Sequence, residues 1–311
     1  MKVWMQISVL ALSAALLAGC GAQTVSAAEP IGIDAANLVL MGLKGFRDDF
    51  EEHILHHRCL GSLRNPVPCV ALCPAGVDIP GYISLVNAGR CDDAVRLIRK
   101  DNPFPTACAY ICEHPCEAQC RRRMVDDAVN ICGLKRFAVD HAAPAAPPER
   151  AADTGKTVAV IGGGPGGMTA AYYLSLMGHQ VTVYEQRPKL GGMLRYGIPD
   201  YRLPQEILDR DIDHILSAGV RVHTGVSIGR DLTMEDIQKS FDAVYIAIGA
   251  HNDKKLGLEG EDSQNVISAV ELLRGIGEGQ VPDFTGKKVC VIGGGNVSMD
   301  ATRTALRLGA D

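Results

Sequence analysis

The stretch that decides the fold is Thr157-Val-Ala-Val-Ile-Gly162-Gly163-Gly164-Pro165-Gly166-Gly167, an apolar run that ends in a glycine-rich turn. The glycines at 162, 164 and 167 have the GxGxxG spacing, after an expected strand at 157–161 and before an expected helix at 168–177. The first glycine allows a tight turn, the second lets the backbone touch a pyrophosphate, and the third lets the helix pack closely on the strand. This pattern predicts a doubly wound, Rossmann-like domain of the α/β class.

An acidic residue stands where such a domain needs one. Glu185 closes the next expected strand, at 180–185, eighteen residues after Gly167. A carboxylate at that place accepts hydrogen bonds from the ribose hydroxyls of a bound dinucleotide. Further strands are expected at 220–224 and 243–248. The predicted nucleotide-binding residues of this domain are therefore Gly162, Gly164, Gly166, Gly167 and Glu185.

A second glycine turn, Gly293-Gly294-Gly295-Asn296-Val297-Ser298, follows an expected strand at 288–292. Its third position is Ser298, which is small enough for helix packing but departs from Gly or Ala. Two such turns are typical of flavoproteins that bind two dinucleotides, with FAD at the first turn and NAD(P)H at the second. We predict NAD(P)H binding at Gly293, Gly295, Asn296 and Ser298. The residue that would distinguish NADH from NADPH is expected after Asp311, so that choice stays open.

Nine of the eleven cysteines lie between residues 58 and 140, a region in which we expect helices at 80–88, 91–100 and 129–142. Thiolates are the soft ligands of iron–sulfur clusters, and a proline directly after a cysteine, as at Cys73, is familiar from bacterial cluster loops. Two 4Fe-4S clusters would use about eight of these thiols. The candidate ligands are Cys59, Cys69, Cys73, Cys108, Cys112, Cys116, Cys120 and Cys132.

Two other uses of these cysteines stay open. Zinc sites favour two to four residues between paired cysteines and a distant second pair, which fits this spacing less well. Disulfides would form in an oxidising compartment, to which residues 1–28 would direct the chain. Those residues hold an apolar run before Cys20 and resemble a bacterial lipoprotein signal, with a buried helix or a misplaced gene start as alternatives.

The overall composition excludes two broad classes of protein. With 47% apolar and 22% charged residues, the 311-residue chain has enough apolar material for a packed core, which excludes a disordered chain. The net charge of −5 argues against nucleic acid as a partner, because the field of the chain would repel phosphates. We see no Ser/His/Asp or paired-carboxylate arrangement for hydrolysis, and the catalytic residues are unknown at this stage.

Six stretches together carry a family resemblance. They are Cys69-Val-Ala-Leu-Cys73-Pro-Ala-Gly-Val-Asp-Ile-Pro80, Cys112-Glu-His-Pro-Cys116-Glu-Ala-Gln-Cys120-Arg, Gly162 to Gly167, Leu190-Gly-Gly-Met-Leu-Arg-Tyr-Gly-Ile-Pro199, Ala247-Ile-Gly249-Ala and Gly293 to Asp300. Through them residues 58–311 resemble the small-subunit family of bacterial glutamate synthase, shared with the N-terminal part of dihydropyrimidine dehydrogenase and with electron-bifurcating ferredoxin-NADP transhydrogenases. The resemblance implies an oxidoreductase in which FAD takes hydride from NAD(P)H and two 4Fe-4S clusters pass single electrons to a partner subunit.

The resemblance also implies a ligand set with two departures. One cluster would use Cys59, Cys69 and Cys120, but the family's second cysteine falls on Ser62, so that cluster is expected to be labile or to be completed by Cys108. The other would use Cys73, Cys112 and Cys116, with a Gln or Glu expected where Lys135 stands. Cys132, one helical turn earlier, is the ligand we predict instead. The resemblance further implies flavin contacts at Gly191, Gly192 and Arg195.

These inferences divide the chain into six predicted segments. They are a lipoprotein signal (1–28), a helical lead-in (29–57), an α-helical double 4Fe-4S domain (58–142), a linker (143–155), an incomplete FAD-binding domain (156–285) and the start of an NAD(P)-binding domain (286–311). The cluster chemistry indicates the cytoplasm, whereas a genuine signal would anchor the chain to a membrane through a lipid on Cys20. The alternatives are a non-catalytic iron–sulfur electron-transfer or docking subunit, and an exported, lipid-anchored, disulfide-bonded protein.

Overall fold

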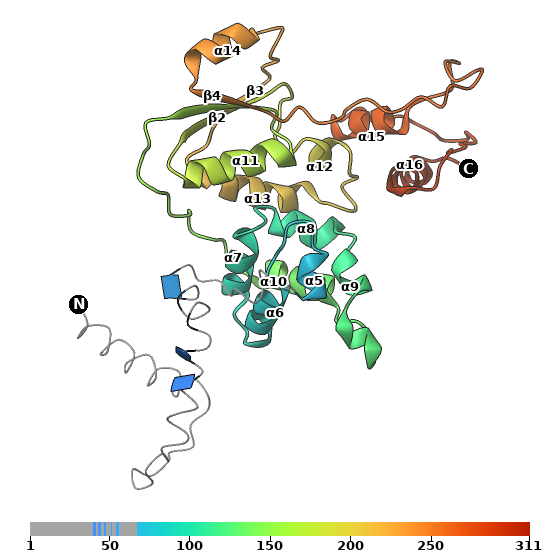
Figure 1. The fold of residues 1–311 in the computed structure, drawn as a ribbon. Coiled ribbons are helices and arrows are strands. Elements are labelled where there is room, and N and C mark those ends of the chain that lie inside the picture. The colour runs from blue at the N-terminus through green and yellow to red at the C-terminus, as the bar shows by residue number, and fades with distance from the viewer. Residues whose placement is uncertain (1–39, 42, 45–46, 48–50, 52–53, 56–66) are drawn as a thin grey trace. The chain divides into compact units, whose positions relative to one another are not determined.

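The structure, a computed structural model, describes residues 40–41, 43–44, 47, 51, 54–55 and 67–311, and it divides into two units at Pro66 and Val67. The described residues between 40 and 55 are helical, as expected of the lead-in. The predicted signal at 1–28, most of the lead-in, Cys59 and Ser62 lie outside the described residues. The unit 67–311 holds the remaining predicted sites, and Figure 1 shows its elements in chain order.

Residues 67–142 form a small helical domain built from short helices (Figure 1), with cysteines both in the helices and in the turns between them. Prolines open four of the helices, where a missing backbone N–H costs nothing. Asp78 caps α6 and Asn130 caps α10, through hydrogen bonds of 3.0 and 2.9 Å from the amides of Gly81 and Gly133. The elements are α5 (Pro68–Ala71), α6 (Ile79–Asn87), α7 (Cys91–Arg99), α8 (Pro105–Ile111), α9 (Pro115–Ala118), the 3-10 turn η1 (Arg121–Met124) and α10 (Ile131–His141).

The core of this helical domain is apolar and continuous. Tyr82, Ile98, Ala138 and Val139 are almost fully buried in it. Each large side chain of this kind contributes roughly 1.5–3 kcal/mol by leaving water. The predicted helices at 80–88, 91–100 and 129–142 are confirmed within one or two residues at each end.

The second domain is a parallel sheet covered by helices. Its strands are β1 (Thr157–Ile161), β2 (Gln180–Glu185), β3 (Arg221–Thr224) and β4 (Ala243–Ile246), in the order β3-β2-β1-β4. The crossover helices are α11 (Pro165–Leu176), α13 (Gln205–Ser217) and α14 (Met234–Ser240), with a short α12 (Met193–Tyr196) before α13. This is the doubly wound arrangement that the first glycine turn predicts.

The core of the sheet domain lies where α11 and α13 pack. Val160 and Val183 from the two central strands are fully buried against Met168 of α11 and against Leu208 and Ile215 of α13. Helix α13 contacts α11 and also α8 of the helical domain. The first glycine turn lies at the carboxyl end of β1, where α11 begins.

The predicted strand at 288–292 is wrong. Between α15 (Ala269–Gly277) and α16 (Asn296–Arg307) this stretch is extended but pairs with no strand among residues 67–311. Ile292 is 73% exposed, in contrast to the buried apolar residues of β1. An apolar run becomes a strand only when a neighbouring strand takes its backbone hydrogen bonds.

Candidate functional site: a glycine turn beside a cysteine-rich domain

Two of the glycines in the first turn are required by their surroundings. A Cβ on Gly167 would lie 1.9 Å from the carbonyl oxygen of Gly162, and one on Gly162 would lie 2.3 Å from that of Ala247. Gly162 also has a φ of +110°, which other residues rarely adopt. Around Gly166, by contrast, nothing lies within 4 Å of a built Cβ. The turn is closed toward the protein and open at Gly166.

The open side of this turn carries hydrogen-bond donors. Helix α11 begins at Pro165, and its N-cap residue, Gly164, has no side chain to satisfy the first amides. A helix of twelve residues also concentrates positive partial charge at this end. Uncapped amides on an open helix N-terminus fit a pyrophosphate.

Glu185 is buried directly beside the turn. Its side chain accepts hydrogen bonds from the amide of Gly163, at 2.7 Å, and from that of Arg187, at 2.8 Å. Only 6% of the residue is exposed. The carboxylate therefore stabilises the conformation of the turn. It keeps further lone pairs that can accept hydrogen bonds from ribose hydroxyls. Its contact with a ribose stays a prediction.

The stretch that holds Gly191, Gly192 and Arg195, the other predicted flavin contacts, packs against the first turn. The amide of Gly191 donates to the carbonyl of Gly163 at 2.8 Å. A Cβ on Gly192 would lie 2.6 Å from Cα of Gly164, and Gly192 has a φ of +52°. Sequence reasoning placed these two glycines in the site, and the structure brings them against the glycine turn.

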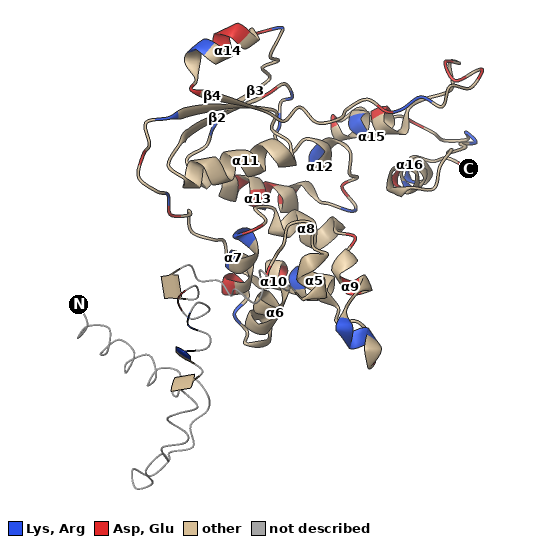
Figure 2. Ribbon diagram, viewed as in Figure 1, with Lys and Arg blue, Asp and Glu red and all other residues tan. Residues whose placement is uncertain are grey.

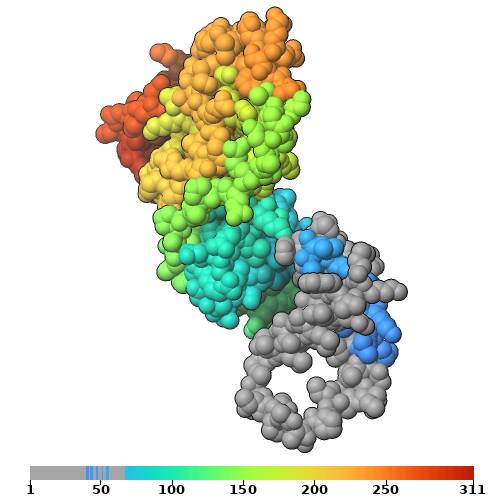
Figure 3. Space-filling view, turned by 90° about the vertical axis from the view of Figure 1, so that its left-hand side faces the viewer, coloured from blue at the N-terminus to red at the C-terminus, as the bar shows by residue number. Residues whose placement is uncertain are grey.

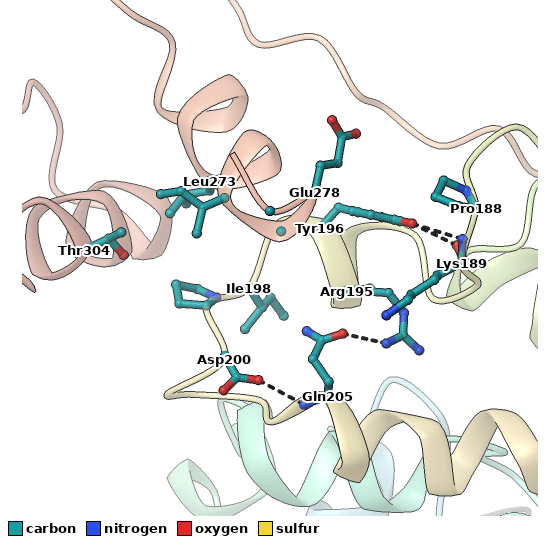
Figure 4. Close-up of a pocket in the computed structure, with 14 residues that line it drawn as sticks. Pro188, Lys189, Arg195, Tyr196, Ile198, Asp200, Gln205, Leu273, Glu278 and Thr304 are labelled. Carbon is teal, nitrogen blue, oxygen red and sulfur yellow. Dashed lines mark hydrogen bonds between the residues drawn. The ribbon is translucent and has the colours of Figure 1, made fainter. Parts of the chain in front are cut away.

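Arg195 is an internal anchor of the same loop. It is 4% exposed, and its guanidinium donates to the carbonyl of Leu190, to Oε1 of Gln205 and to the carboxylate of Asp209. Figure 4 shows the hydrogen bond to Gln205 at the edge of a cavity. A direct contact between Arg195 and flavin stays a prediction.

The cavity beside Arg195 has a volume of about 420 Å³ and is shown in Figure 4. Tyr196 and Ile198 form one wall, and Leu273 and Glu278 come from the segment of α15. The Tyr196 hydroxyl accepts a hydrogen bond of 3.2 Å from the amide of Lys189, and burial raises its pKa. An apolar cavity with a few polar groups at its rim is suited to an aromatic ring system.

The second glycine turn has the same local backbone shape as the first, but no strand of the sheet directly precedes it. Gly293 has a φ of +126°, and helix α16 follows with Gly295 as an N-cap that has no capping side chain. A Cβ on Gly293 would lie 2.5 Å from Oγ of Ser298, so the serine occupies the space over the turn. The Asn296 side chain donates to the carboxylate of Glu113, which lies between two cysteines of the helical domain.

The pKa shifts of the described cysteines indicate which thiols lie near one another. Burial, followed by the charge of Cys120, raises the pKa of Cys69. Burial and the charges of Cys112 and Cys73 raise the pKa of Cys116 to about 11. Cys132 has a pKa raised by burial and by the charge of Cys112. Cys69 thus lies near Cys120. Cys73, Cys112, Cys116 and Cys132 form a second group, because the charges of Cys112 and Cys73 affect Cys116 and the charge of Cys112 affects Cys132.

Cys108 and Lys135 lie with the second group. Burial raises the pKa of Cys108, the charge of Cys112 adds to this effect, and Lys135 opposes it. The same lysine opposes the rise in the pKa values of Cys116 and Cys132. Cys108 also lines a cavity of about 470 Å³ whose other wall includes Gly166. Completion of the Cys59 cluster by Cys108 stays a prediction, and these neighbours do not favour it.

Three residues that sequence reasoning missed surround the second cysteine group. The buried Tyr82 donates to the carbonyl of Ile131 at 3.1 Å, and burial with the charges of Cys116 and Cys132 raises its pKa. Glu117 accepts from the amide of Cys132 at 2.8 Å. His114 has a φ of +41° and donates its amide to Sγ of Cys112 at 3.3 Å. The acid and the histidine between cysteines are the signal that could have found two of them.

The described part of the chain bears on two alternative uses of the cysteines, disulfide bonds and a site for a single metal ion. All nine described cysteines are free thiols, so no disulfide forms among them. Within residues 67–311 no three potential ligands converge as they would around one metal ion. A 4Fe-4S cluster is larger than a single ion, so its four thiolates stand farther apart.

Comparison with known proteins assigns both domains. Residues 156–311, half of the chain, match the family model of the pyridine nucleotide-disulphide oxidoreductases. The chain belongs to this family. Residues 49–146 match the model described as dihydropyrimidine dehydrogenase domain II, 4Fe-4S cluster. The predicted fold class, the resemblance and the three cofactor classes, 4Fe-4S clusters, FAD and a nicotinamide nucleotide, are confirmed at the level of these families.

Several relatives of the chain are named as beta subunits or small chains. The chain is 42% identical over 288 residues to the NADPH-Fe(3+) oxidoreductase subunit beta of Geobacter sulfurreducens, covering 88% of this chain and 42% of the relative. It is 40% identical over 269 residues to the NADP(+)-dependent formate dehydrogenase subunit beta of Moorella thermoacetica, covering 78% and 38%. It is 34% identical over 281 residues to the glutamate synthase small chain of Mycobacterium tuberculosis, covering 85% and 57%. The chain thus spans about two fifths to just over half of the length of these relatives.

The comparisons give no support to the predicted lipoprotein signal, which falls outside the described residues. In the described part of the chain, no helix has the length and apolar character needed to cross a bilayer.

Proposed function

We propose that this chain is an NAD(P)H-dependent iron–sulfur flavoprotein module that passes electrons from a nicotinamide nucleotide, through FAD and two 4Fe-4S clusters, to a partner subunit. The observation that carries the proposal is the cavity of about 470 Å³ between the domains. One wall is formed by Cys108 of α8 and by Phe104, which precedes this helix, and the other by Gly166 and Thr169 at the start of α11. The nucleotide turn and a cysteine-bearing helix therefore share one space.

FAD would be held by the first turn and the loop that docks on it. The amides at the start of α11 would bind the pyrophosphate, and Glu185 would bind a ribose. Gly191 and Gly192 let the 190–196 loop approach the turn, while Arg195 keeps the loop in place. Bound there, FAD supplies the exchange between two-electron hydride chemistry and one-electron transfer. The proposed FAD-binding residues are Gly162, Gly164, Gly166, Gly167, Glu185, Gly191, Gly192 and Arg195.

NAD(P)H would bind at the second turn, through Gly293, Gly295, Asn296 and Ser298. The uncapped start of α16 supports this assignment, since it offers free amides to a phosphate. The names of the relatives favour NADPH, because each of the three contains NADPH or NADP(+). Titration with NADPH and with NADH tests this choice, and equal affinity for the two would contradict it.

One cluster would be held by four thiolates of the second cysteine group, Cys73, Cys112, Cys116 and Cys132. The side chains around them fit an anionic cluster. Lys135 supplies a positive charge, and the amide of His114 already donates to Cys112. The other cluster would be held by Cys59, Cys69 and Cys120, with Ser62 in place of a thiol. Serine is a harder ligand, so this cluster should be the more labile.

The proposal is tested first by composition. The protein, purified without oxygen, is assayed for iron, acid-labile sulfide and flavin. About eight irons and one FAD per chain support the proposal, following the ligand count for two four-iron clusters. About four irons would identify the Ser62 cluster as lost, and iron-free protein with bound FAD would contradict the electron-transfer role.

The role of Cys132 has its own test. Cys132→Ala should remove about four irons, those of one cluster, because three thiolates hold a 4Fe-4S cluster weakly. Cys91→Ala is the matched control, since Cys91 is also a free thiol of the helical domain but lies at the start of α7 and is no predicted ligand. Full iron content in Cys132→Ala would refute the assignment.

A second candidate function is a non-catalytic electron-transfer or docking subunit. The extended, unpaired stretch at 288–292 favours it, because a nicotinamide site normally rests on a formed strand. In that case both clusters assemble, but NAD(P)H reduces neither the flavin nor the clusters. Nucleotide-dependent dye reduction by the chain distinguishes the two functions.

The partner and the location belong to the same proposal. The relatives are beta or small chains by name, which supports an electron-accepting partner subunit for this chain. Assembly of 4Fe-4S clusters on reduced thiols supports a cytoplasmic location. A lipid anchor at Cys20 is the alternative, and cell fractionation of the wild-type protein and Cys20→Ala separates the two.

A further inference from the structure

Asp211 is a fully buried carboxylate to which the proposed function assigns no part. It lies on α13 of the sheet domain and has an exposed fraction of 0%. Its Oδ2 accepts a hydrogen bond of 2.8 Å from the amide of Ala107, and its Oδ1 one of 3.3 Å from the amide of Thr106. Both amides belong to the first turn of α8. A side chain of one domain therefore satisfies the backbone of a helix in the other.

The charge on Asp211 is balanced from the helical domain as well. The guanidinium of Arg99, the last residue of α7, lies 3.8 Å from its Oδ1. Arg99 is also tied to the sheet domain, since the Tyr173 hydroxyl of α11 donates to its carbonyl at 3.4 Å. Burial raises the pKa of Asp211 and lowers the pKa of Arg99, so each charge depends on the other. Figure 3 shows the two domains in continuous contact.

Helix α8 connects the contacts of Asp211 to the cysteines. It carries Cys108 in its middle, and Cys112 follows directly after its last residue. Its flank contacts α10, the helix of Cys132 and Lys135. Since Asp211 binds the amides that open α8, its carboxylate fixes where this helix begins relative to α13 and to the glycine turn above it.

We propose that Asp211 is a positioning residue for electron transfer, which sets the separation between the flavin and the Cys112 cluster by holding α8 against the sheet domain. This inference rests on the proposed function. In the step concerned, the reduced flavin would give one electron to the oxidised cluster and release one proton to solvent. Transfer of this kind depends steeply on the separation of the two centres, so a small displacement of α8 changes its rate.

The experiment uses the full protein with its flavin and clusters, purified without oxygen. A light pulse with deazaflavin and EDTA reduces the flavin, so no hydride transfer is needed, and absorbance and electron paramagnetic resonance follow electron arrival at the clusters. Asp211→Ala should slow flavin-to-cluster transfer severalfold or more, because a displaced α8 increases the separation of the two centres. Iron and flavin contents should stay at the wild-type level.

Three further measurements separate positioning from general stability. Asp213→Asn, on the exposed side of the same helix, should leave the rate unchanged. Asp211→Asn should recover part of the rate, because its amide oxygen can still accept from Ala107. In the metal-free protein, the amides of Thr106 and Ala107 should exchange with solvent about tenfold faster in Asp211→Ala than in the wild type, since they lose their acceptor.

The outcomes divide cleanly. A wild-type transfer rate in Asp211→Ala, with faster exchange at Thr106 and Ala107, would overturn the inference and leave the proposed function intact. If Asp211→Ala does not fold, Asp211→Asn decides by the same criterion. A wild-type protein that holds flavin and clusters but shows no transfer between them would overturn both proposals.

Discussion

The two glycine turns of this chain share one sequence pattern and differ in their surroundings. The first lies at the end of β1, which pairs with β2 on one side and β4 on the other. The second follows an extended stretch that has no strand partner among residues 67–311. Both are followed by a twelve-residue helix without a capping side chain. The local sequence thus determines the turn and the helix, whereas the strand depends on partners elsewhere.

The contrast extends to the third position of each motif. Gly167 has no room for a side chain, because a Cβ would meet the carbonyl of Gly162 at 1.9 Å. At the equivalent place Ser298 keeps its hydroxyl over Gly293, with nothing near Gly294 or Gly295. A turn pressed against a formed sheet restricts its residues more than a turn that stands free of one.

The largest expected difference is in hydrogen exchange. Amides at 158–161 should exchange at least about a thousandfold more slowly, relative to their intrinsic rates, than those at 289–292, because ladder amides exchange only on cooperative opening. Exchange detected by mass spectrometry on overlapping peptides measures this ratio. Similar protection in the two stretches would mean that 288–292 has found a strand partner and would remove the contrast.

The next largest effect follows from making the first turn resemble the second. Gly167→Ser forces the helix start away from Gly162, and we expect a loss of about 3 kcal/mol in the free energy of unfolding, within the range of severe local clashes. FAD affinity should fall at least about a hundredfold, an effect of about 3 kcal/mol. Thermal unfolding and fluorescence titration with FAD measure the two effects.

The matched control for this change is Gly166→Ala, one residue earlier. Nothing lies within 4 Å of a Cβ at Gly166, so the free energy of unfolding should hardly change. FAD should still bind more weakly, since the methyl group projects into the open side of the turn. If Gly167→Ser bound FAD like the wild type, the close packing at this turn would have no role in the site.

What could be predicted from the sequence follows the same division between local and distant causes. The glycine turn, its helix and the strands at 157–161 and 180–185 have local signals, and all are found where expected. The helix predicted at 91–100 is also found, because its apolar residues recur on one face and bury Val95 and Ile98. The strand at 288–292 has the same apolar signal as β1 but no partner, which composition alone cannot reveal.

The candidate site shows the same limit. The two ligand sets are implied by the family resemblance alone, and they stay predictions, although Cys120 is near enough to Cys69 to influence its pKa. The partners of Arg195 and the acceptor role of Glu117 toward the amide of Cys132 were not predicted. The hydrogen bonds from Thr106 and Ala107 to Asp211 join positions more than 100 residues apart, and no local pattern marks such a pair.

A smaller effect is expected from the carboxylate that only the first turn possesses. Glu185→Gln keeps one acceptor oxygen but turns an NH2 group toward the backbone amides of Gly163 or Arg187. The loss of a hydrogen bond to a buried charged acceptor costs about 1–3 kcal/mol, so FAD affinity should fall about tenfold. Titration with FAD measures it, with the exposed Glu206→Gln as control. An unchanged affinity would remove Glu185 from the ribose site.

The smallest expected effect comes from the reverse exchange, Ser298→Gly, which gives the second turn the motif of the first. Glycine fits there without a clash, and its cost is the added flexibility of a helix residue, up to about 1 kcal/mol in the free energy of unfolding. Affinity for NADPH should change less than about threefold, because the Ser298 hydroxyl lies over Gly293 rather than in the open space beside Gly294. Thermal unfolding and nucleotide titration measure both quantities. A tenfold change in affinity would show that Ser298 contacts the nucleotide, and the two turns would then differ in how they bind as well as in how they fold.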